Sequence, residues 1–276
     1  MIEVGPNSYG KSAIRLVKVV RGETPQRVRD LTIAIALSGD FDASYDAGDN
    51  TGVVATDTMK NTAYAMAGEH LTGSIEAFGL VLGRHFLAAE LVREARVSIA
   101  EHRWLPIGSA PDAFSRDGSF TRTAVVTVAT GGAEIRGGFL DLSVMKTTRS
   151  AFAGFPRDRF TTLKETDDRI MATKATVDWG YVAGADVDFD AAFDAIRATF
   201  LDVFAAHHSP SVQASIWIVG KAMLERHAEL TDVRMSLPNL HHWTVDLSPF
   251  AIENEREVYV ATAEPHGLIE ATVRRS

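Results

Sequence analysis

The predicted order of strands and helices repeats along the chain, and this repeat constrains the fold more than any other feature of the sequence. The first half has patterns of two strands, two helices and two strands, at residues 13–20, 28–37, 57–68, 74–91, 92–106 and 119–129. The same order returns in the second half, at residues 134–148, 170–182, 189–207, 212–229, 231–247 and 257–273. The sequence therefore predicts an α+β protein built from a duplicated ββααββ unit.

The join between the two halves is predicted near Thr130-Gly131-Gly132, which gives tandem domains at residues 1–131 and 132–276. Each domain would have antiparallel strands with its helices on one face. Four strands are too few to close a barrel within one domain, and they leave sheet edges that need covering. We therefore expect several copies of the chain to assemble into a multi-subunit β-barrel.

Charge and composition narrow the class of partner. The 276 residues include 28 basic and 36 acidic side chains, which gives a net charge of −8 without a long run of either sign. This balance gives no electrostatic footprint for nucleic acid or an anionic membrane, so a small molecule is the expected partner. The absence of cysteine excludes disulfides, thiolate nucleophiles and cysteine-based metal sites.

The ends of the chain and its hydropathy favour a cytoplasmic protein. The N-terminal residues lack the basic and apolar regions of a signal peptide, and no stretch approaches the roughly 18 uninterrupted apolar residues of a membrane span. Residues 273–276 differ from the Ser-Lys-Leu peroxisomal signal, which favours a bacterial type of protein.

Residues 5–12 match the phosphate-binding loop pattern G-x-x-x-x-G-K-[ST] letter for letter. A genuine loop of this kind follows a buried strand and opens a helix whose N-terminus holds the phosphate. Here only four residues precede the match and a predicted strand follows it. We therefore interpret the match as accidental.

Three other clusters suggest metal sites but have simpler explanations. The acidic stretch from Ser38 to Asn50 lacks the glycine and the final glutamate of a calcium loop, so a solvated loop is expected. The pair His207-His208 falls at the end of a predicted helix, where histidine interacts favourably with the helix dipole. The pair His241-His242 falls in a strand, where adjacent side chains point to opposite faces. We therefore predict no metal site.

A few polar side chains are candidates for a site, and each also has an ordinary structural interpretation. They are Lys11, Thr56, Asp57, Thr58, Arg169, Gln213, Asn239 and His241. Thr56 or Asp57 would cap the helix that follows, and Arg169 would pair with the acidic residues before it. Phe152 would ordinarily belong to the core. The residue types alone do not choose between these interpretations.

Several separate motifs are spread over nearly the whole chain. The most specific is the block from Lys146 to Phe155, which continues through Arg157-Asp158 and from Thr161 to Arg169. The other stretches are Tyr9-Gly10-Lys11, Val54 to Thr58, Lys60 to Thr62, Ser209 to Gln213, Ser236 to His241 and Gly267 to Val273. Together, in this order along the chain, they resemble the urate oxidase family, and their number leaves little room for coincidence.

The resemblance implies a fold and a shared site. It implies tandem tunnelling-fold domains, in agreement with the duplicated order, and a homotetramer with active sites between subunits. In this arrangement Lys11, Thr56 and Asp57 of one subunit face residues of its neighbour, namely Phe152, Arg169, Val212, Gln213, Asn239 and His241. The chain differs from the family at variable positions such as Ala153 and Leu240, which bear on substrate affinity rather than on reaction type.

The implied reaction is the oxidation of urate by molecular oxygen and water to 5-hydroxyisourate and hydrogen peroxide, in purine degradation, without a metal or an organic cofactor. Phe152 would stack on the flat purine, and Arg169 and Gln213 would clamp its edges through paired hydrogen bonds. Backbone N–H groups at Asp57 and Val212 would complete the fit.

The same resemblance implies a proton relay made by Lys11, Thr56 and His241, because the protein must mainly move protons once urate itself supplies the electrons. Asn239 and Thr56 would hold oxygen, and later water, above the purine ring. Two alternatives remain open: a pterin-handling enzyme of the same fold class, which would generally need zinc, and a non-catalytic purine-binding protein, which would have no need of the relay.

Overall fold

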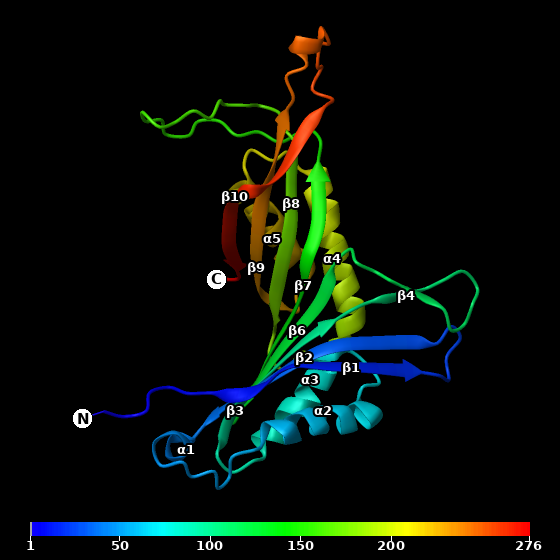
Figure 1. The fold of residues 1–276 in the computed structure, drawn as a ribbon, viewed down its shortest axis with the longest axis vertical. Coiled ribbons are helices and arrows are strands. Elements are labelled where there is room, and N and C mark those ends of the chain that lie inside the picture. Colours follow the sequence, from blue (N-terminus) through cyan, green and yellow to red (C-terminus); the bar gives the residue numbers. More distant parts are fainter. Residues whose placement is uncertain (1) are drawn as a thin grey trace. The chain divides into compact units, whose positions relative to one another are not determined.

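The computed structural model describes residues 2–276, and contacts within it divide the chain into two compact units (Figure 1). Unit 1 comprises residues 2–138 and Trp179–Phe193, and unit 2 comprises Phe139–Asp178 and Asp194–Ser276. Within residues 2–276, eight strands form one sheet and two short strands form another. The α+β class predicted from the sequence is therefore confirmed.

Unit 1 has four long strands in which each pairs antiparallel with the next. They are β1 (Tyr9–Val20), β2 (Arg27–Gly39), β3 (Val92–Glu101) and β6 (Thr121–Ala129). In β2 the alternate residues Leu31, Ile33, Ile35 and Leu37 are buried, while the residues between them are only partly buried. This period of two places one apolar row on the face that the helices cover.

Two helices, α2 (Thr56–His70) and α3 (Ile75–Leu87), cover that face of unit 1 (Figure 1). Helix α3 lies very close to the sheet, because a Cβ atom added at Gly83 would lie 2.5 Å from Cγ2 of Val128. Glycine at this position permits the close packing of helix on sheet, as only a residue without a side chain fits there.

Short elements of unit 1 differ from the sequence-based expectation. Helix α1 (Asp42–Asp46) forms within the stretch predicted as a solvated loop. The strand predicted at 92–106 is interrupted, and its end forms β4 (Trp104–Pro106), which pairs with β5 (Phe114–Arg116) in a separate two-stranded sheet. These pieces are too short to show a period in the sequence.

The remaining elements belong to unit 2 wholly or in part. They are β7 (Gly132–Lys146), β8 (Met171–Tyr181), α4 (Phe189–Ala206), α5 (Val212–Arg226), β9 (Leu230–Thr244), η1 (Ser248–Phe250) and β10 (Tyr259–Arg274). Helix α5 packs against β9 and β10, which pair antiparallel with a register shift between Thr262 and Gly267. The β7–β8 and β9–β10 connections lie at the same end of unit 2 (Figure 1). Among residues 2–276 there is no helix with the length and apolar character needed to span a membrane.

Candidate active site

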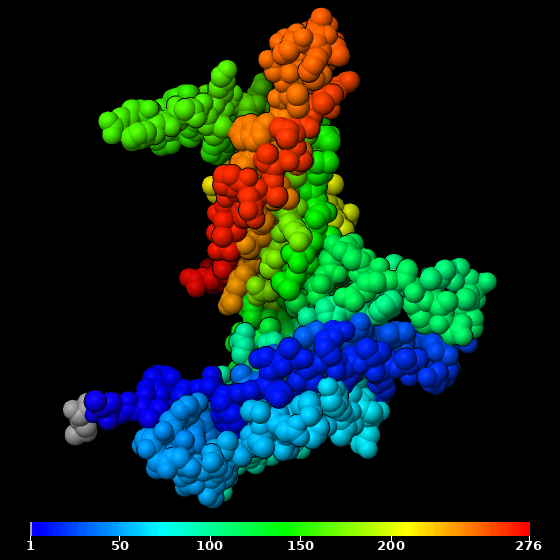
Figure 2. All heavy atoms as spheres, in the orientation of Figure 1, coloured from blue at the N-terminus to red at the C-terminus, as the bar shows by residue number. Residues whose placement is uncertain are grey.

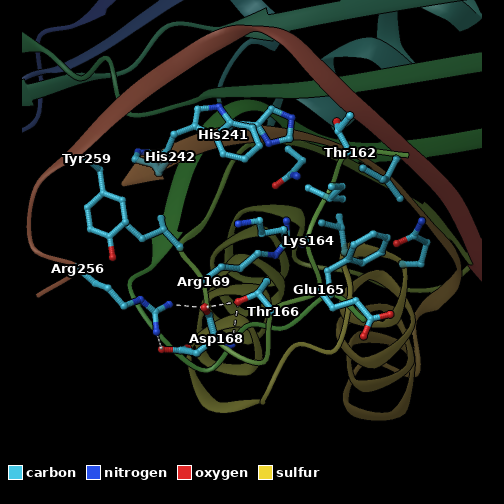
Figure 3. Close-up of a pocket in the computed structure, with 18 residues that line it drawn as sticks. Thr162, Lys164, Glu165, Thr166, Asp168, Arg169, His241, His242, Arg256 and Tyr259 are labelled. Carbon is cyan, nitrogen blue, oxygen red and sulfur yellow. Dashed lines mark hydrogen bonds and ion pairs between the residues drawn. The ribbon is translucent and has the colours of Figure 1, made fainter. Parts of the chain in front are cut away.

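A pocket with a volume of about 660 Å³ lies entirely in unit 2 (Figure 3). Its walls come from the β7–β8 connection, the start of α5, and the β9–β10 hairpin. It is lined by six of the residues predicted for the site: Phe152, Arg169, Val212, Gln213, Asn239 and His241. The fold thus gathers side chains that are far apart in the sequence.

Phe152 is held in the pocket wall by backbone hydrogen bonds rather than by the core. Its N–H donates to the Thr166 carbonyl at 2.8 Å, and the Thr166 N–H donates back at 3.1 Å. The Phe152 ring stacks on Phe155, with centroids 5.0 Å apart and planes inclined by 13°. Phe152 is only partly buried, so an aromatic surface is available to a flat ligand.

Arg169 lies beside this ring, with its guanidinium carbon 5.5 Å from the Phe152 centroid. Its backbone is fixed, since its N–H donates to the Ser150 carbonyl at 2.7 Å. Its side chain forms no ion pair with the acidic residues before it, and its Nε is buried without a hydrogen-bond partner among residues 2–276. Burial lowers the pKa of the Arg169 guanidinium. A buried donor of this kind suits a planar anion that accepts paired hydrogen bonds.

Val212 and Gln213 occupy the first turn of α5, whose N-terminal N–H groups have no partner within the helix. The hydroxyl of Ser211 caps this turn by accepting from the Ala214 N–H at 3.1 Å. The carbonyl of Ser209 accepts from the Ala151 N–H at 2.7 Å. The start of α5 is therefore fixed to the segment that precedes Phe152.

Asn239 and His241 lie two residues apart on β9 and both line the pocket. The His241 ring stacks on Trp243, with centroids 5.2 Å apart and planes inclined by 27°. Burial, assisted by the positive charge of Arg169 and by two nearby histidines, lowers the pKa of His241 below its ordinary 6.5. The imidazole is therefore neutral at neutral pH and can both accept and donate a proton.

The other three predicted residues, Lys11, Thr56 and Asp57, belong to unit 1 and do not line this pocket. Lys11 lies on β1 at the edge of a register shift that extends to Ile14. Thr56 and Asp57 open α2, but Ala55 occupies the N-cap position and no side chain caps the helix. The capping interpretation of Thr56 and Asp57 is therefore wrong.

Asp57 is engaged within its own helix. Its carboxylate pairs with the Lys60 ammonium and accepts from the Asn61 amide at 2.9 Å. The hydrogen bond and the charge of Lys60 hold the pKa of Asp57 below its ordinary value. The backbone that leads into α2 is tied to β1, because the Val54 N–H donates to the Tyr9 hydroxyl at 2.9 Å.

Reasoning from the sequence missed several residues of the pocket wall. They include Asp168, Trp243, Arg256 and Tyr259. Asp168 precedes the predicted residue Arg169 in the chain, so its position could have indicated a place in the site. Arg256 lies in a polar connection without any periodic pattern, so the sequence gives no such indication for it. Within the described part of the chain, no three histidine, aspartate or glutamate side chains are grouped so as to hold a metal ion.

The chain matches the family model described as Uricase over residues 7–127 and 135–270. It is 44% identical to the uricase of Arthrobacter globiformis over 275 residues, which cover 99% of this chain and 90% of that relative. It is 37% identical to the uricase of Dictyostelium discoideum over 278 residues, which cover 98% of this chain and 96% of that relative.

Solved structures agree with the sequence comparisons. The crystal structure of the uricase from Arthrobacter globiformis superposes with a TM-score of 0.96 at 43% identity, over 100% of this chain and 96% of that one. A uricase from Bacillus fastidious has the same fold, with a TM-score of 0.83 at 24% identity, over 97% of this chain and 93% of that one. The tunnelling fold expected from the sequence is the fold of these structures.

Proposed function

The chain belongs to the uricase family, so it is an oxidoreductase that acts on urate, and from this premise we propose how its residues perform the reaction. Urate, molecular oxygen and water would react to give 5-hydroxyisourate and hydrogen peroxide, without a metal or an organic cofactor. The observation that carries this proposal is the partly buried Arg169 side chain beside the Phe152 ring, whose buried Nε has no hydrogen-bond partner among residues 2–276, in a pocket that Gln213 and His241 also line.

Substrate binding follows from the flat shape and negative charge of urate. Phe152 stacks on the purine ring, and the planar fork of Arg169 donates two hydrogen bonds to one edge of the anion. The Gln213 amide donates and accepts across another edge. The N–H of Val212, at the start of α5, adds a donor where the helix dipole favours negative charge.

Proton transfer is assigned to Lys11, Thr56 and His241. They remove a proton from bound urate through a hydroxyl or a water molecule and later return one to the departing peroxide. The lowered pKa of His241 supports this role, since it keeps the imidazole in the neutral form, which is the form able to accept a proton. Asn239 and Thr56 hold oxygen, and then water, above the ring.

We propose, from the family resemblance, that a complete site combines residues of two copies of the chain in a homotetramer. Arg169 and five other proposed site residues line one pocket in unit 2, and Lys11, Thr56 and Asp57 belong to unit 1. We assign these two groups to neighbouring subunits. We further propose that residues 1–131 and 132–276 are the tandem ββααββ domains whose sheets join around a common barrel.

The experiment that tests this function follows urate and oxygen in a sample treated exhaustively with chelators. Loss of urate ultraviolet absorbance and release of hydrogen peroxide in equal amounts are expected, at the rate of the untreated sample. A rate that falls on chelation and recovers with one added metal would contradict the cofactor-free proposal, and absence of peroxide would contradict the proposed product.

A further inference from the structure

Arg256 occupies an unusual backbone position in the connection between β9 and β10. Its φ of 65° lies in the left-handed region, which residues other than glycine and asparagine rarely adopt. The connection is an exposed projection of unit 2, drawn in orange in Figure 2. A strained residue on an exposed loop persists only where contacts of that residue or its neighbours hold it in place.

The connection is fixed by Asn254. Its side-chain amide donates to the carbonyls of Val245 and Val258, both at 2.8 Å. Its side-chain oxygen accepts from the N–H groups of Glu257 and Val258 at 3.0 and 3.1 Å. These hydrogen bonds hold the backbone around Arg256 in a closed loop without any contribution from the Arg256 side chain.

The Arg256 side chain reaches across the pocket wall to Asp168 (Figure 3). Its Nη2 donates to the backbone carbonyl of Asp168, and its Nη1 lies 3.8 Å from the Asp168 carboxylate. The same carbonyl accepts from the Thr166 hydroxyl at 2.7 Å. The Asp168 carboxylate accepts from the Thr148 hydroxyl at 2.9 Å and from the Arg149 N–H at 2.7 Å.

This carbonyl belongs to the peptide group whose nitrogen is that of Arg169. On the other side of that group, the Arg169 N–H donates to the Ser150 carbonyl. The Arg169 side chain has no ion pair of its own within residues 2–276. The direction in which its guanidinium enters the pocket therefore depends on the backbone at 168–169, which Arg256 holds together with Thr166 and Ser150.

We propose that Arg256 is a positioning residue for urate binding, which acts through the Asp168 peptide to aim Arg169 at the substrate. The inference rests on the proposed role of Arg169 as the urate clamp and extends it to a residue 88 positions away along the chain from Asp168. It assigns a function to the β9–β10 connection: the loop carries the group that orients the clamp.

The test uses variants that remove the guanidinium without disturbing the loop. Glycine and asparagine both accept a left-handed backbone. Arg256→Gly and Arg256→Asn therefore serve as two independent variants, and one remains for the test if the other fails to fold. Arg256→Lys keeps a positive charge and a hydrogen-bonding group but loses the planar fork of the guanidinium. Arg93→Ala is the matched control, because the Arg93 side chain is 57% exposed against 53% for Arg256 and likewise pairs with a carboxylate, that of Asp40.

Two readouts separate positioning from folding: the KM and kcat of urate oxidation, and titration with urate in the absence of oxygen. For Arg256→Gly and Arg256→Asn we expect KM and the urate dissociation constant to rise about three- to tenfold, the scale of one lost hydrogen bond. We expect kcat to stay within about twofold of wild type, because the proposed relay is untouched. Arg256→Lys should recover part of the loss, and the control should match wild type.

Arg169→Lys, alone and combined with Arg256→Gly, distinguishes this inference from the function on which it rests. If Arg256 acts through Arg169, the double variant should bind urate about as weakly as Arg169→Lys alone. If the losses of urate affinity from the two changes multiply in the double variant, the role of Arg256 is overturned but the clamp stands. The same holds if Arg256→Gly has a normal KM while Arg169→Lys binds urate poorly. A normal KM in Arg169→Lys would overturn the clamp and the inference together.

Discussion

A buried carboxylate in unit 1 makes the stability of the protein depend on pH in an unusual direction. Glu76, on α3, is fully buried, and its Oε2 accepts from Nη2 of Arg122 at 2.8 Å, while its Oε1 has no hydrogen-bond partner among residues 2–276. Arg122 interacts with two carboxylates, because its Nη1 also donates to Asp190 at 2.6 Å. Burial raises the pKa of Glu76 to about 7, from an ordinary 4.5, although the charge of Arg122 opposes the rise.

The sign of the effect follows from proton binding. Between pH 4.5 and 7 the folded chain keeps a proton on Glu76 that the unfolded chain has lost, so the free energy of unfolding falls as pH rises through this range. The difference of about 2.5 between the two pKa values corresponds to at most about 3 kcal/mol per chain. Glu76→Gln retains the volume of the side chain but does not titrate.

We therefore expect the stability of Glu76→Gln relative to wild type to rise by about 2 to 3 kcal/mol between pH 5 and pH 8. Denaturant unfolding at a fixed protein concentration, repeated between pH 5 and pH 8, measures this difference. Glu94→Gln, an exposed change on β3, is the matched control and should give a curve parallel to wild type. Parallel curves for Glu76→Gln and wild type would refute the reasoning, because they would mean that Glu76 has the same protonation in both states.

Two further predictions concern the pocket and the proposed relay. Arg169→Lys should raise the KM for urate about tenfold or more, because a point charge cannot reproduce two parallel hydrogen bonds. Steady-state rates over a range of urate concentrations measure this change. An unchanged KM would exclude the clamp. Lys11→Ala should lower kcat by roughly 10² to 10⁴, with a smaller effect on anaerobic urate binding, because the relay acts after urate is bound. Weakened binding with a normal kcat would assign Lys11 to substrate binding instead.

Much of the fold follows from periodic patterns in the sequence. The alternating apolar row of β2 and the capped starts of α3 and α5 locate long elements, because buried faces and caps leave a local signal. The sequence predicts an end of α3 that is too late, because Ala88, Ala89 and Glu90 all favour a helix although the helix ends at Leu87. Tertiary packing decides such ends, and a sequence window does not contain it.

The site was harder to derive from residue types. Phe152 is an apolar residue of the kind usually found in a core, yet its backbone pairing with Thr166 holds it in a pocket wall. The acidic neighbours of Arg169 suggest an ordinary ion pair, but the Asp168 carboxylate is taken by Thr148 and the backbone of Arg149. The resemblance to a family identified these positions. The reason why each residue lies in the pocket became clear only from the contacts in the structure.

The most direct test of a site shared between subunits mixes two inactive variants, Lys11→Ala and Arg169→Ala, after unfolding them together and reassembling them. In a mixed pair, the Arg169→Ala chain supplies an intact Lys11 and the Lys11→Ala chain supplies an intact Arg169, so one of the two sites is whole. Random assembly should therefore restore at most about a quarter of wild-type urate oxidation. A tag on one variant allows mixed assemblies to be isolated and their composition verified. Activity in these assemblies is the predicted result, and verified mixed assemblies that remain inactive would contradict the shared site.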